Sequence, residues 1–559
     1  MKKFFLFAGL ISLLIPVAVF AAGAGQSQNV TQNSTSFITA PGQMPIVTQP
    51  CTISIGMPVQ PSITDYYNNY FTKWLQNKTG LTLQFELFAA SSADARTQFE
   101  LMVSSGQKLP DIVRLSLTNW REHGDNGVFV DLNPYFEKNA FYYNIAMDKL
   151  KSKFGDDRER DRIKLKTSSY TGKRYAYSNY NDSEGDLQMH TTMINTTWLN
   201  NLGLKMPTTT SELRDVLIAF RDKDPNKNGK NDEIPLLGLY GGYRSNIVNW
   251  LVNAFVYWIP EASNVGAVNV TNGKIWVPYA TDEYRDALRY IRGLVSEKLL
   301  SEMTFSITHN EMIALLNPAD SNFTVGVSTG HPVLVWTPNS AVVDHYRFVP
   351  SLTGPKGVNW APVGMPIVSG FSYISKNAQF PDVTFRLLDF FSSEDSTVIM
   401  RLGEEGVDWN YAKPGALNAL GETARFQSPN TLWGSNAQSQ NWRTQTGDYM
   451  INVSMVYTDD GSWPSRRTNA MRDLVAINRG KQPKEIVDEV VLTQEEQSSV
   501  GEILSSINSY VNEQQTLFCV GQRDIERDWN DYINTLNRIG LQRYLDIVQK
   551  AYTRTINNL

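Results

Sequence analysis

Residues 51–88 read CTISIGMPVQPSITDYYNNYFTKWLQNKTGLTLQFELF, and two periodicities alternate within them. Around Ile53 and Ile55, apolar residues occupy every second position, which is typical of a strand. Aromatic and aliphatic residues then recur at three- and four-residue intervals from Tyr66 to Leu75, and Gly80 stands where a helix would end. From residue 81 the alternation returns. The stretch therefore predicts a strand, a helix and a second strand.

The same order of elements continues along the chain. A helical pattern over residues 93–105 ends at Gly106, and the segment PDIV at 110–113 begins a third strand. Strands and helices that alternate in this way predict an α/β fold with a largely parallel sheet. A second unit begins near residue 190: Thr209 and Glu212 have the spacing of a capping box. Apolar residues at helical intervals over 529–548 predict a helical C-terminal region.

Length and composition narrow the class of protein. The 559 residues exceed what one hydrophobic core usually organises, so two lobes are expected. Hydrophobic residues make up 42% and charged residues 19%, as in a soluble globular protein. The net charge of −5 gives no basic surface for nucleic acid. Much of the aromatic content (13 Trp, 25 Tyr and 25 Phe) is ordinary core, but a surplus of Trp and Tyr suits a protein that holds its ligand with flat aromatic faces.

The first residues have the form of a targeting segment. Lys2 and Lys3 precede the apolar run 4–20, and small residues follow at 21–24, so we expect residues 1–24 to be a cleaved signal peptide. An uncleaved membrane anchor is the alternative. Residues 25–49 are polar and predict a flexible linker. No Cys follows the apolar run, which argues against a lipid anchor. The protein is therefore expected to be exported, either periplasmic or associated with the cell surface.

The chain contains two cysteines, Cys51 and Cys519. In an oxidising compartment they could form a disulfide, or each could be a separate buried thiol. The sequence leaves both alternatives open because it does not give the distance between them. With five His and no cluster of Cys, a zinc site is not expected.

Residues 224–233, DPNKNGKNDE, carry the most specific chemistry of the sequence. Side-chain oxygens occupy positions one, three and five, a Gly follows for a sharp turn, and a carbonyl and two carboxylates complete the set. Calcium prefers six to eight such oxygens at about 2.3–2.6 Å. Position twelve is Pro235, so the loop departs from the standard EF-hand pattern, and a polar surface turn is the alternative. The spacing predicts a structural Ca²⁺ site with the ligands Asp224, Asn226, Asn228, Lys230 (through its carbonyl), Asp232 and Glu233.

The run INTTWLNNLGLKMPTTTSELRDVLIAFRDKDPNKNGKNDEIPL at 194–236 resembles the family 1 extracellular solute-binding proteins of ABC importers, which include lipoprotein-like sugar binders and alginate-binding proteins. Shorter runs resemble the same family in the same order; they lie at 110–116, 127–138, 385–409 and 518–552. In that family the loop equivalent to 224–233 holds calcium. The missing Cys after the apolar run and Cys519 depart from the pattern of the family.

The resemblance implies an α/β, two-lobed clamshell of the periplasmic-binding-protein type (type II, large cluster). The expected N-lobe comprises residues 50–180 and 371–480, and the C-lobe comprises 190–366 and 481–559, with crossings near 177–190 and 366–371. The resemblance further implies a substrate-binding component of an ABC transporter that holds an oligosaccharide between its lobes and delivers it to the permease subunits. A monomer without enzymatic activity is expected.

A sugar site needs aromatic faces for the rings and polar groups for the hydroxyls. Trp120 follows the predicted strand at 110–113, at the end where α/β sheets bind ligands. For each Trp, packing in the core is the alternative; Trp74, Trp198 and Trp529 lie on helical apolar stripes and are predicted to be core residues. The predicted ligand-binding residues are Trp120, Trp336, Trp442, Trp250, Trp258, Trp409, Arg244 and Asp182.

Two other functions fit parts of the pattern. A glycoside hydrolase would need a pair of carboxylates at a defined separation, and no motif of the sequence singles out such a pair. A peptide-binding protein of the same fold, or an extracellular sensor, is also compatible with the sequence, because the fold does not specify the ligand.

Overall fold

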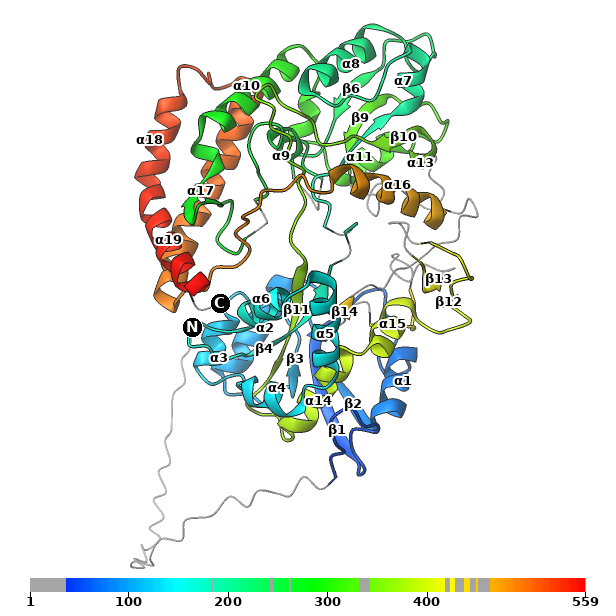
Figure 1. The fold of residues 1–559 in the computed structure, drawn as a ribbon, viewed down its shortest axis with the longest axis vertical. Coiled ribbons are helices and arrows are strands. Elements are labelled where there is room, and N and C mark those ends of the chain that lie inside the picture. The colour runs from blue at the N-terminus through cyan, green and yellow to red at the C-terminus, as the bar shows by residue number, and fades with distance from the viewer. Residues whose placement is uncertain are drawn as a thin grey trace, which may run out of the picture.

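The computed structural model describes residues 37–557, apart from 183, 186, 242–244, 261–262, 331–341, 418–422, 428–436, 443–448 and 451–462. Its elements form two lobes, one above the other in Figure 1. Each lobe is built around its own sheet, of six strands in the lower lobe and four in the upper lobe. We call the lower one the first lobe and the upper one the second lobe.

The first lobe contains most of the chain before residue 182 and the part after residue 366 up to β14. Its strands are β1 Cys51–Pro58, β2 Leu81–Phe88, β3 Ile112–Val113, β4 Ala176–Asn181, β11 Ile367–Ile374 and β14 Tyr449–Met450, with the β12 Asn410–Tyr411 and β13 Phe426–Gln427 hairpin. Its helices are α1 Tyr70–Thr79, α2 Ser92–Ser104, α3 Trp120–Asp125, α4 Asn133–Asn139, α5 Tyr142–Phe154, α6 Arg158–Thr167, α14 Pro381–Phe391 and α15 Glu394–Leu402.

The second lobe contains the middle of the chain and its C-terminal helices. Its strands are β5 Thr192–Asn195, β6 Ile234–Leu237, β7 Asn269–Thr271, β8 Lys274–Trp276, β9 Val325–Thr329 and β10 Tyr346–Phe348. Its helices are α7 Thr196–Leu202, α8 Thr210–Asp222, α9 Ile247–Val252, η1 Pro278–Ala280, α10 Asp282–Ser296, η2 Glu302–Phe305, α11 His309–Leu316, α13 Val342–His345, α16 Trp463–Asn478, α17 Gln494–Val520, α18 Trp529–Ile539 and α19 Leu541–Asn557.

The sheet of the first lobe has the strand order β14-β4-β11-β3-β1-β2. Strand β1 runs parallel to β2 and β3, as the sequence predicts. Strand β11 runs antiparallel to both β3 and β4, so the sheet is mixed rather than largely parallel. The reason is that β11 enters this sheet from the second lobe and not through a helix of the first lobe.

The predicted strand–helix–strand at residues 51–88 is present, with a later start for the helix. The side chain of Asn69 accepts from the backbone N–H of Phe71 and caps α1, so Tyr66 precedes the helix. The helix ends at Gly80, whose φ of 75° places it in the left-handed region that favours glycine. The predicted capping box of Thr209 and Glu212 is likewise present at the start of α8.

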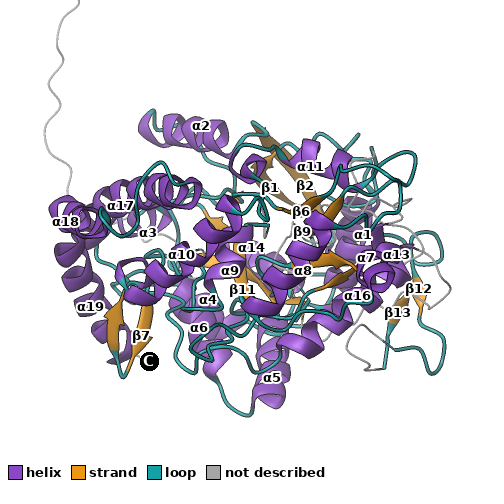
Figure 2. Ribbon diagram, turned by 90° about the horizontal axis from the view of Figure 1, so that it is seen from above, coloured by secondary structure: helices purple, strands orange, loops and turns teal. Residues whose placement is uncertain are grey.

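The sheet of the second lobe has the order β10-β5-β9-β6, in which β6 and β9 are parallel. The helices α17, α18 and α19 pack against α10 and the β7–β8 hairpin through one large hydrophobic cluster. Figure 2 shows these three helices along one flank of the molecule, beside β7. The helical C-terminal region is thus part of the second lobe.

Two segments, 182–191 (described apart from 183 and 186) and 349–366, carry the chain between the lobes, and we call them the crossing segments. They lie side by side: Met189 N–H donates to the Pro362 carbonyl (2.7 Å), and Gly364 N–H donates to the Leu187 carbonyl (2.8 Å). The chain returns to the second lobe between β14 and α16. Residues 479–493, which we call the boundary segment, then run along the junction of the lobes to α17.

The expected lobe boundary at residue 480 differs from the structure. Helix α16 packs in the second lobe because Ala470 and Leu474 are buried with Met193 and Leu237 of that lobe. The second expected crossing also lies earlier than 366–371, since β11 already begins at Ile367. The other lobe boundaries expected from the sequence stay predictions.

Both cysteines are free and buried, Cys51 in the core of the first lobe and Cys519 in that of the second. Among the described residues, none of the helices has both the length and the apolar character needed to cross a membrane.

The close packing of the second sheet can be tested directly by adding a methyl group to its core. A Cβ on Gly326, in the middle of β9, would lie 2.4 Å from Phe220 Cδ2 and 2.8 Å from the Pro235 carbonyl oxygen. We expect Gly326→Ala to lower the free energy of unfolding by about 1–3 kcal/mol because the core is overpacked. Gly293→Ala in α10 is the matched control: nothing lies within 4 Å of its Cβ, so it should stabilise by roughly 0.5–1 kcal/mol. Urea unfolding of both variants measures the difference, and equal effects would contradict the packing.

Candidate functional site

A small cavity of about 210 Å³ lies where the two lobes meet. The first lobe contributes α3 and the loop at Tyr170, and the second lobe contributes the start of α17. The side-chain amide of Gln494 donates to Glu122 Oε1 at 2.8 Å across this junction. Most of the residues that line this cavity are polar, and the two lobes are already in direct contact beside it. The cavity therefore marks the junction of the lobes.

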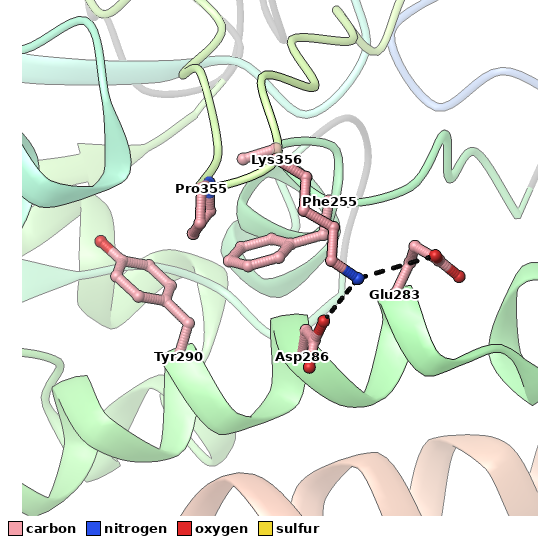
Figure 3. A pocket seen from close by; sticks show the side chains of 7 residues that line it. Phe255, Glu283, Asp286, Tyr290, Pro355 and Lys356 are labelled. Atoms are coloured by element: carbon pink, nitrogen blue, oxygen red, sulfur yellow. Dashed lines mark ion pairs between the residues drawn. The ribbon is translucent and has the colours of Figure 1, made fainter.

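A second cavity, of about 330 Å³, lies wholly within the second lobe. Phe255, Tyr290 and Pro355 form its apolar wall (Figure 3). Lys356 extends past Phe255, and its ammonium lies 3.0 Å from Asp286 Oδ2 and 3.8 Å from Glu283 Oε1. All of these residues belong to one lobe, so this cavity does not match the expected site between lobes.

Five of the six predicted tryptophans are described, and all five are buried. Trp442 is 0% exposed: its indole N–H donates to Thr72 Oγ1 (2.7 Å), and Phe71 and Phe85 meet its ring edge to face. Trp120 packs against Phe371 and Tyr373 and carries the Arg121 guanidinium 4.3 Å from its ring centroid. These two rings are packed against protein within the first lobe.

The other three described tryptophans have similar surroundings. Trp250 and Trp258 belong to the main cluster of the second lobe, and Trp258 Nε1 donates to Asn249 Oδ1 at 2.7 Å. Trp409 packs on Phe426 and donates to the Gly403 carbonyl at 3.0 Å. These positions differ from the expected ones, because a stacking platform needs an open face and each indole finds its partners inside its own lobe. A ligand role for all five stays a prediction that their burial disfavours. The predicted core positions of Trp198 and Trp529 are confirmed.

Asp182 is the first residue of a crossing segment and is 4% exposed. Its carboxylate accepts from Lys153 Nζ at 2.9 Å. Burial raises the pKa of Asp182, and the ammonium of Lys153 opposes that rise. Its predicted role as a ligand-binding residue is untested, and the structure gives it a partner on α5.

Arg244 and Trp336 lie outside the described residues. Both follow parallel strands of the second sheet: β6 ends at Leu237 and β9 ends at Thr329. The carboxyl ends of neighbouring parallel strands share one edge of a sheet, which is where α/β folds bind ligands.

The predicted cation loop, residues 224–233, is a compact turn built by side-chain oxygens. The two carboxylate oxygens of Asp224 accept from the backbone N–H groups of Asn228 (3.1 Å) and Gly229 (2.9 Å), and Asn228 Oδ1 accepts from Lys230 N–H (2.7 Å). Gly229 has a φ of 72°, which the turn requires at this position. The loop therefore gathers the oxygens of positions one to five on its inner side.

Asp232 is held by the side-chain amides of Asn226 and Asn228, with N–O distances of 3.1–3.2 Å. Amide oxygen and nitrogen exchange places when the terminal torsion turns by half a revolution, so the same side chains can present oxygen. Asn322 also contacts this group, since its Oδ1 accepts from Asn228 Nδ2 at 3.3 Å. Sequence spacing gave no signal for Asn322, which lies 94 residues away along the chain.

Glu233 decides whether the loop fits a cation. Its Oε1 is buried and has no hydrogen-bond partner. Burial raises the pKa of Glu233, and the carboxylates of Asp232 and Asp224 add to that effect. A buried carboxylate oxygen without a donor, beside two further carboxylates, is the environment a hard divalent cation would satisfy. Among the described residues, however, no group of three or more His, Cys, Asp and Glu is gathered as a metal site, so amide and carbonyl oxygens would have to contribute.

The model of the family described as bacterial extracellular solute-binding protein matches residues 60–398. The chain belongs to this family. The resemblance found in the sequence is thereby confirmed, and the two-lobed α/β architecture agrees with it.

Relatives of this solute-binding protein align over most of its length. The fructooligosaccharide ABC transporter substrate-binding protein FusA of Streptococcus pneumoniae serotype 4 is 25% identical over 503 residues, 86% of this chain and 85% of FusA. A structure described as a FusA EF-hand mutant in complex with fructo-nystose has a TM-score of 0.65 at 22% identity, covering 91% of this chain and 100% of that one. An extracellular solute-binding protein from Bifidobacterium longum subsp. infantis has a TM-score of 0.71 at 18% identity, covering 90% and 98%.

The burial of Trp442 leads to a prediction. Trp442→Ala should lower the free energy of unfolding by about 3–5 kcal/mol, because it leaves a large cavity among aromatic rings. Trp442→Phe keeps most of the packing and loses the bond to Thr72, so it should cost less. Urea unfolding followed by far-UV circular dichroism measures both. A Trp442→Ala protein of unchanged stability would show that the indole packs less tightly than described.

Proposed function

We propose that this protein is the substrate-binding component of an ABC transporter and that it binds an oligosaccharide between its lobes. The observation that best supports the proposal is the construction of the chain as two separate sheets joined by a few crossing segments. The full-length similarity to FusA supports the sugar class of the ligand. No step of chemistry is part of this proposal, since the ligand is bound and released unchanged.

The proposed mechanism is closure around the ligand. A ligand that contacts both lobes binds their closed arrangement better than the open one and shifts the population towards it. Aromatic side chains cover the C–H faces of the sugar rings, and polar side chains pair with the hydroxyls. An unpaired hydroxyl in a closed site costs about 1–3 kcal/mol, so the polar side chains would set the specificity.

Arg244 and Trp336 are the ligand-binding residues that we retain in this proposal. They follow β6 and β9 by seven residues each, and these strands are parallel neighbours. Their loops therefore begin at the same edge of the second sheet. Trp336 would supply a stacking face, and Arg244 would pair with hydroxyl or carboxylate groups of the sugar.

The proposal is tested by a thermal-shift screen of defined oligosaccharides that includes kestose and longer fructooligosaccharides, followed by calorimetry. A ligand at 100 times its Kd should stabilise the protein by about 2.7 kcal/mol. We expect Trp336→Ala to raise Kd by roughly 30-fold, equivalent to about 2 kcal/mol. Trp276→Ala, on the β7–β8 hairpin, is the control and should leave Kd unchanged. Stabilisation by peptides but by none of the sugars, or conversion of a sugar into products, would contradict the proposal.

We further propose that residues 224–233 bind a structural Ca²⁺. The unpartnered Glu233 oxygen supports this, as does the description of a FusA variant as an EF-hand mutant. The loop contacts Asn322 and the carbonyl of Phe323, directly before β9, and is followed at once by β6. It thus lies at the amino ends of these parallel strands, opposite the carboxyl ends from which Arg244 and Trp336 follow. That placement supports a stabilising role rather than contact with the sugar.

Removal of the cation provides the test. We expect EDTA to lower Tm by roughly 5–10 °C and excess Ca²⁺ to restore it, because a cation bound well above its Kd stabilises the folded state. Asp224→Asn should weaken this response, and Glu302→Gln, an exposed carboxylate of the same lobe, should leave it unchanged. A Tm insensitive to EDTA and Ca²⁺ would identify the loop as a polar turn.

The remaining proposals concern export, location and partners. We propose that residues 1–24 are cleaved as a signal peptide, that residues 25–49 form a tether, and that the protein acts outside the cytoplasmic membrane as a monomer. Membership in the extracellular solute-binding family supports export. Residues 1–36 lie outside the described residues. The partners would be the permease subunits of the transporter.

A further inference from the structure

A cluster of mostly half-buried charges joins the boundary segment of the second lobe to helices α3 and α6 of the first lobe. Its acidic members are Asp488 and Glu489 of the boundary segment and Glu159 of α6. Its basic members are Arg121, Arg162 and Lys166. Their side chains are 5–16% exposed, and three positive charges face three negative ones. We call this group the junction cluster.

The contacts of Arg162 place it at the centre of the junction cluster. Its Nε donates to Asp488 Oδ2 at 2.6 Å, and its Nη1 donates to Glu159 Oε2 at 3.2 Å. Its Nη2 donates to the backbone carbonyl of Pro366, the last residue of a crossing segment. Tyr180, close to the start of the other crossing segment, donates its hydroxyl to the same Glu159 oxygen at 2.9 Å. One guanidinium therefore joins the end of one crossing segment to the boundary segment, and through Glu159 it is linked to β4, just before the other crossing segment.

The rest of the cluster strengthens the same connection. Lys166 Nζ lies 3.0 Å from Asp488 Oδ1 and 3.4 Å from Glu489 Oε2. Arg121 Nη2 donates to Glu489 Oε1 at 2.8 Å, while Arg121 Nε donates to the Ser168 carbonyl at 2.9 Å. Both carboxylates of the boundary segment are thus held by cations that are anchored in the first lobe.

The neighbours of these carboxylates are fixed in the second lobe. Val487 and Val490 are buried in its main hydrophobic cluster. The backbone N–H of Val490 donates to Asn264 Oδ1 (2.9 Å), and its carbonyl accepts from Asn264 Nδ2 (2.8 Å). Over these four consecutive residues, two valine side chains that are held in the second lobe therefore flank two carboxylates that are held by the first lobe.

We propose that the junction cluster is the pivot of lobe movement and that Arg162 is a positioning residue, which sets the relative orientation of the lobes without contacting the ligand. The lobes can rotate about this fixed point. Its charges have little contact with solvent, so pulling them apart would leave each one without a partner and would cost free energy. The crossing segments, which are paired to each other at 187–189 and 362–364, then take up the change in backbone angles. This inference concerns lobe movement and does not depend on the identity of the ligand.

The test uses the full-length protein without ligand. Spin labels at Leu101→Cys in the first lobe and Met303→Cys in the second lobe report the distance between lobes; these positions are 63% and 47% exposed, whereas the native cysteines are buried. Arg162→Gln and Asp488→Asn should broaden the distance distribution. They should also speed hydrogen exchange of the Val490 amide about tenfold, as opening becomes about 1.4 kcal/mol easier. Arg386→Gln is the control: Arg386 is a buried arginine of the first lobe that donates to the carbonyls of Thr39 and Gln43.

The outcomes separate a pivot from ordinary packing. If all three variants lose thermal stability but keep the wild-type distance distribution and Val490 exchange, the cluster only stabilises the fold and the proposal is wrong. If Arg162→Gln fails to fold, Asp488→Asn decides the question, because the amide keeps the shape of the side chain and removes its charge. Glu489→Gln provides a further variant of the same kind. Because no sugar is added, failure here leaves the oligosaccharide proposal untouched.

Discussion

Strand β11 lies between β3 and β4 in the first sheet, although the whole second sheet separates β4 from β11 along the chain. The first lobe can complete its core only when the chain has left it, built the second lobe and returned. Both crossing segments must therefore lie next to the place where β4 ends and β11 begins. This constraint brings Tyr180, Pro366 and the boundary segment within reach of one helix, α6.

Burying charges where these segments meet costs free energy unless each charge has a partner of opposite sign. Main-chain carbonyls and carboxylates from three segments converge where little solvent reaches, and buried groups of this kind need partners. Helix α6 supplies these partners through Arg162 and Lys166, which lie one turn apart on the same face of the helix. The arrangement explains why a junction between two lobes is polar, whereas the interior of each lobe is made of aromatic and aliphatic side chains.

Local patterns in the sequence were sufficient for local structure. The alternation at residues 51–58 and 81–88, the glycine that ends α1 and the capping box of α8 depend on neighbours in the chain, and all were predictable. The surroundings of the tryptophans were not. Trp442 is buried by Phe71 and Phe85, more than 350 residues away, and no periodicity near residue 442 reports those contacts. For the same reason the sequence did not indicate the junction cluster, whose members come from three distant parts of the chain. It also did not indicate the lobe to which α16 belongs, because that depends on contacts with Met193 and Leu237.

Charge balance distinguishes the two polar clusters of this protein. The junction cluster sets Arg121, Arg162 and Lys166 against three carboxylates, so its charges cancel within the protein. The loop at 224–233 carries the carboxylates of Asp224, Asp232 and Glu233, and the amides that hold Asp232 are neutral. Glu233 is left with a buried oxygen that lacks a donor. A buried carboxylate oxygen without a donor is an environment that a hard divalent cation would satisfy, whereas the charges of the junction cluster are matched within the protein.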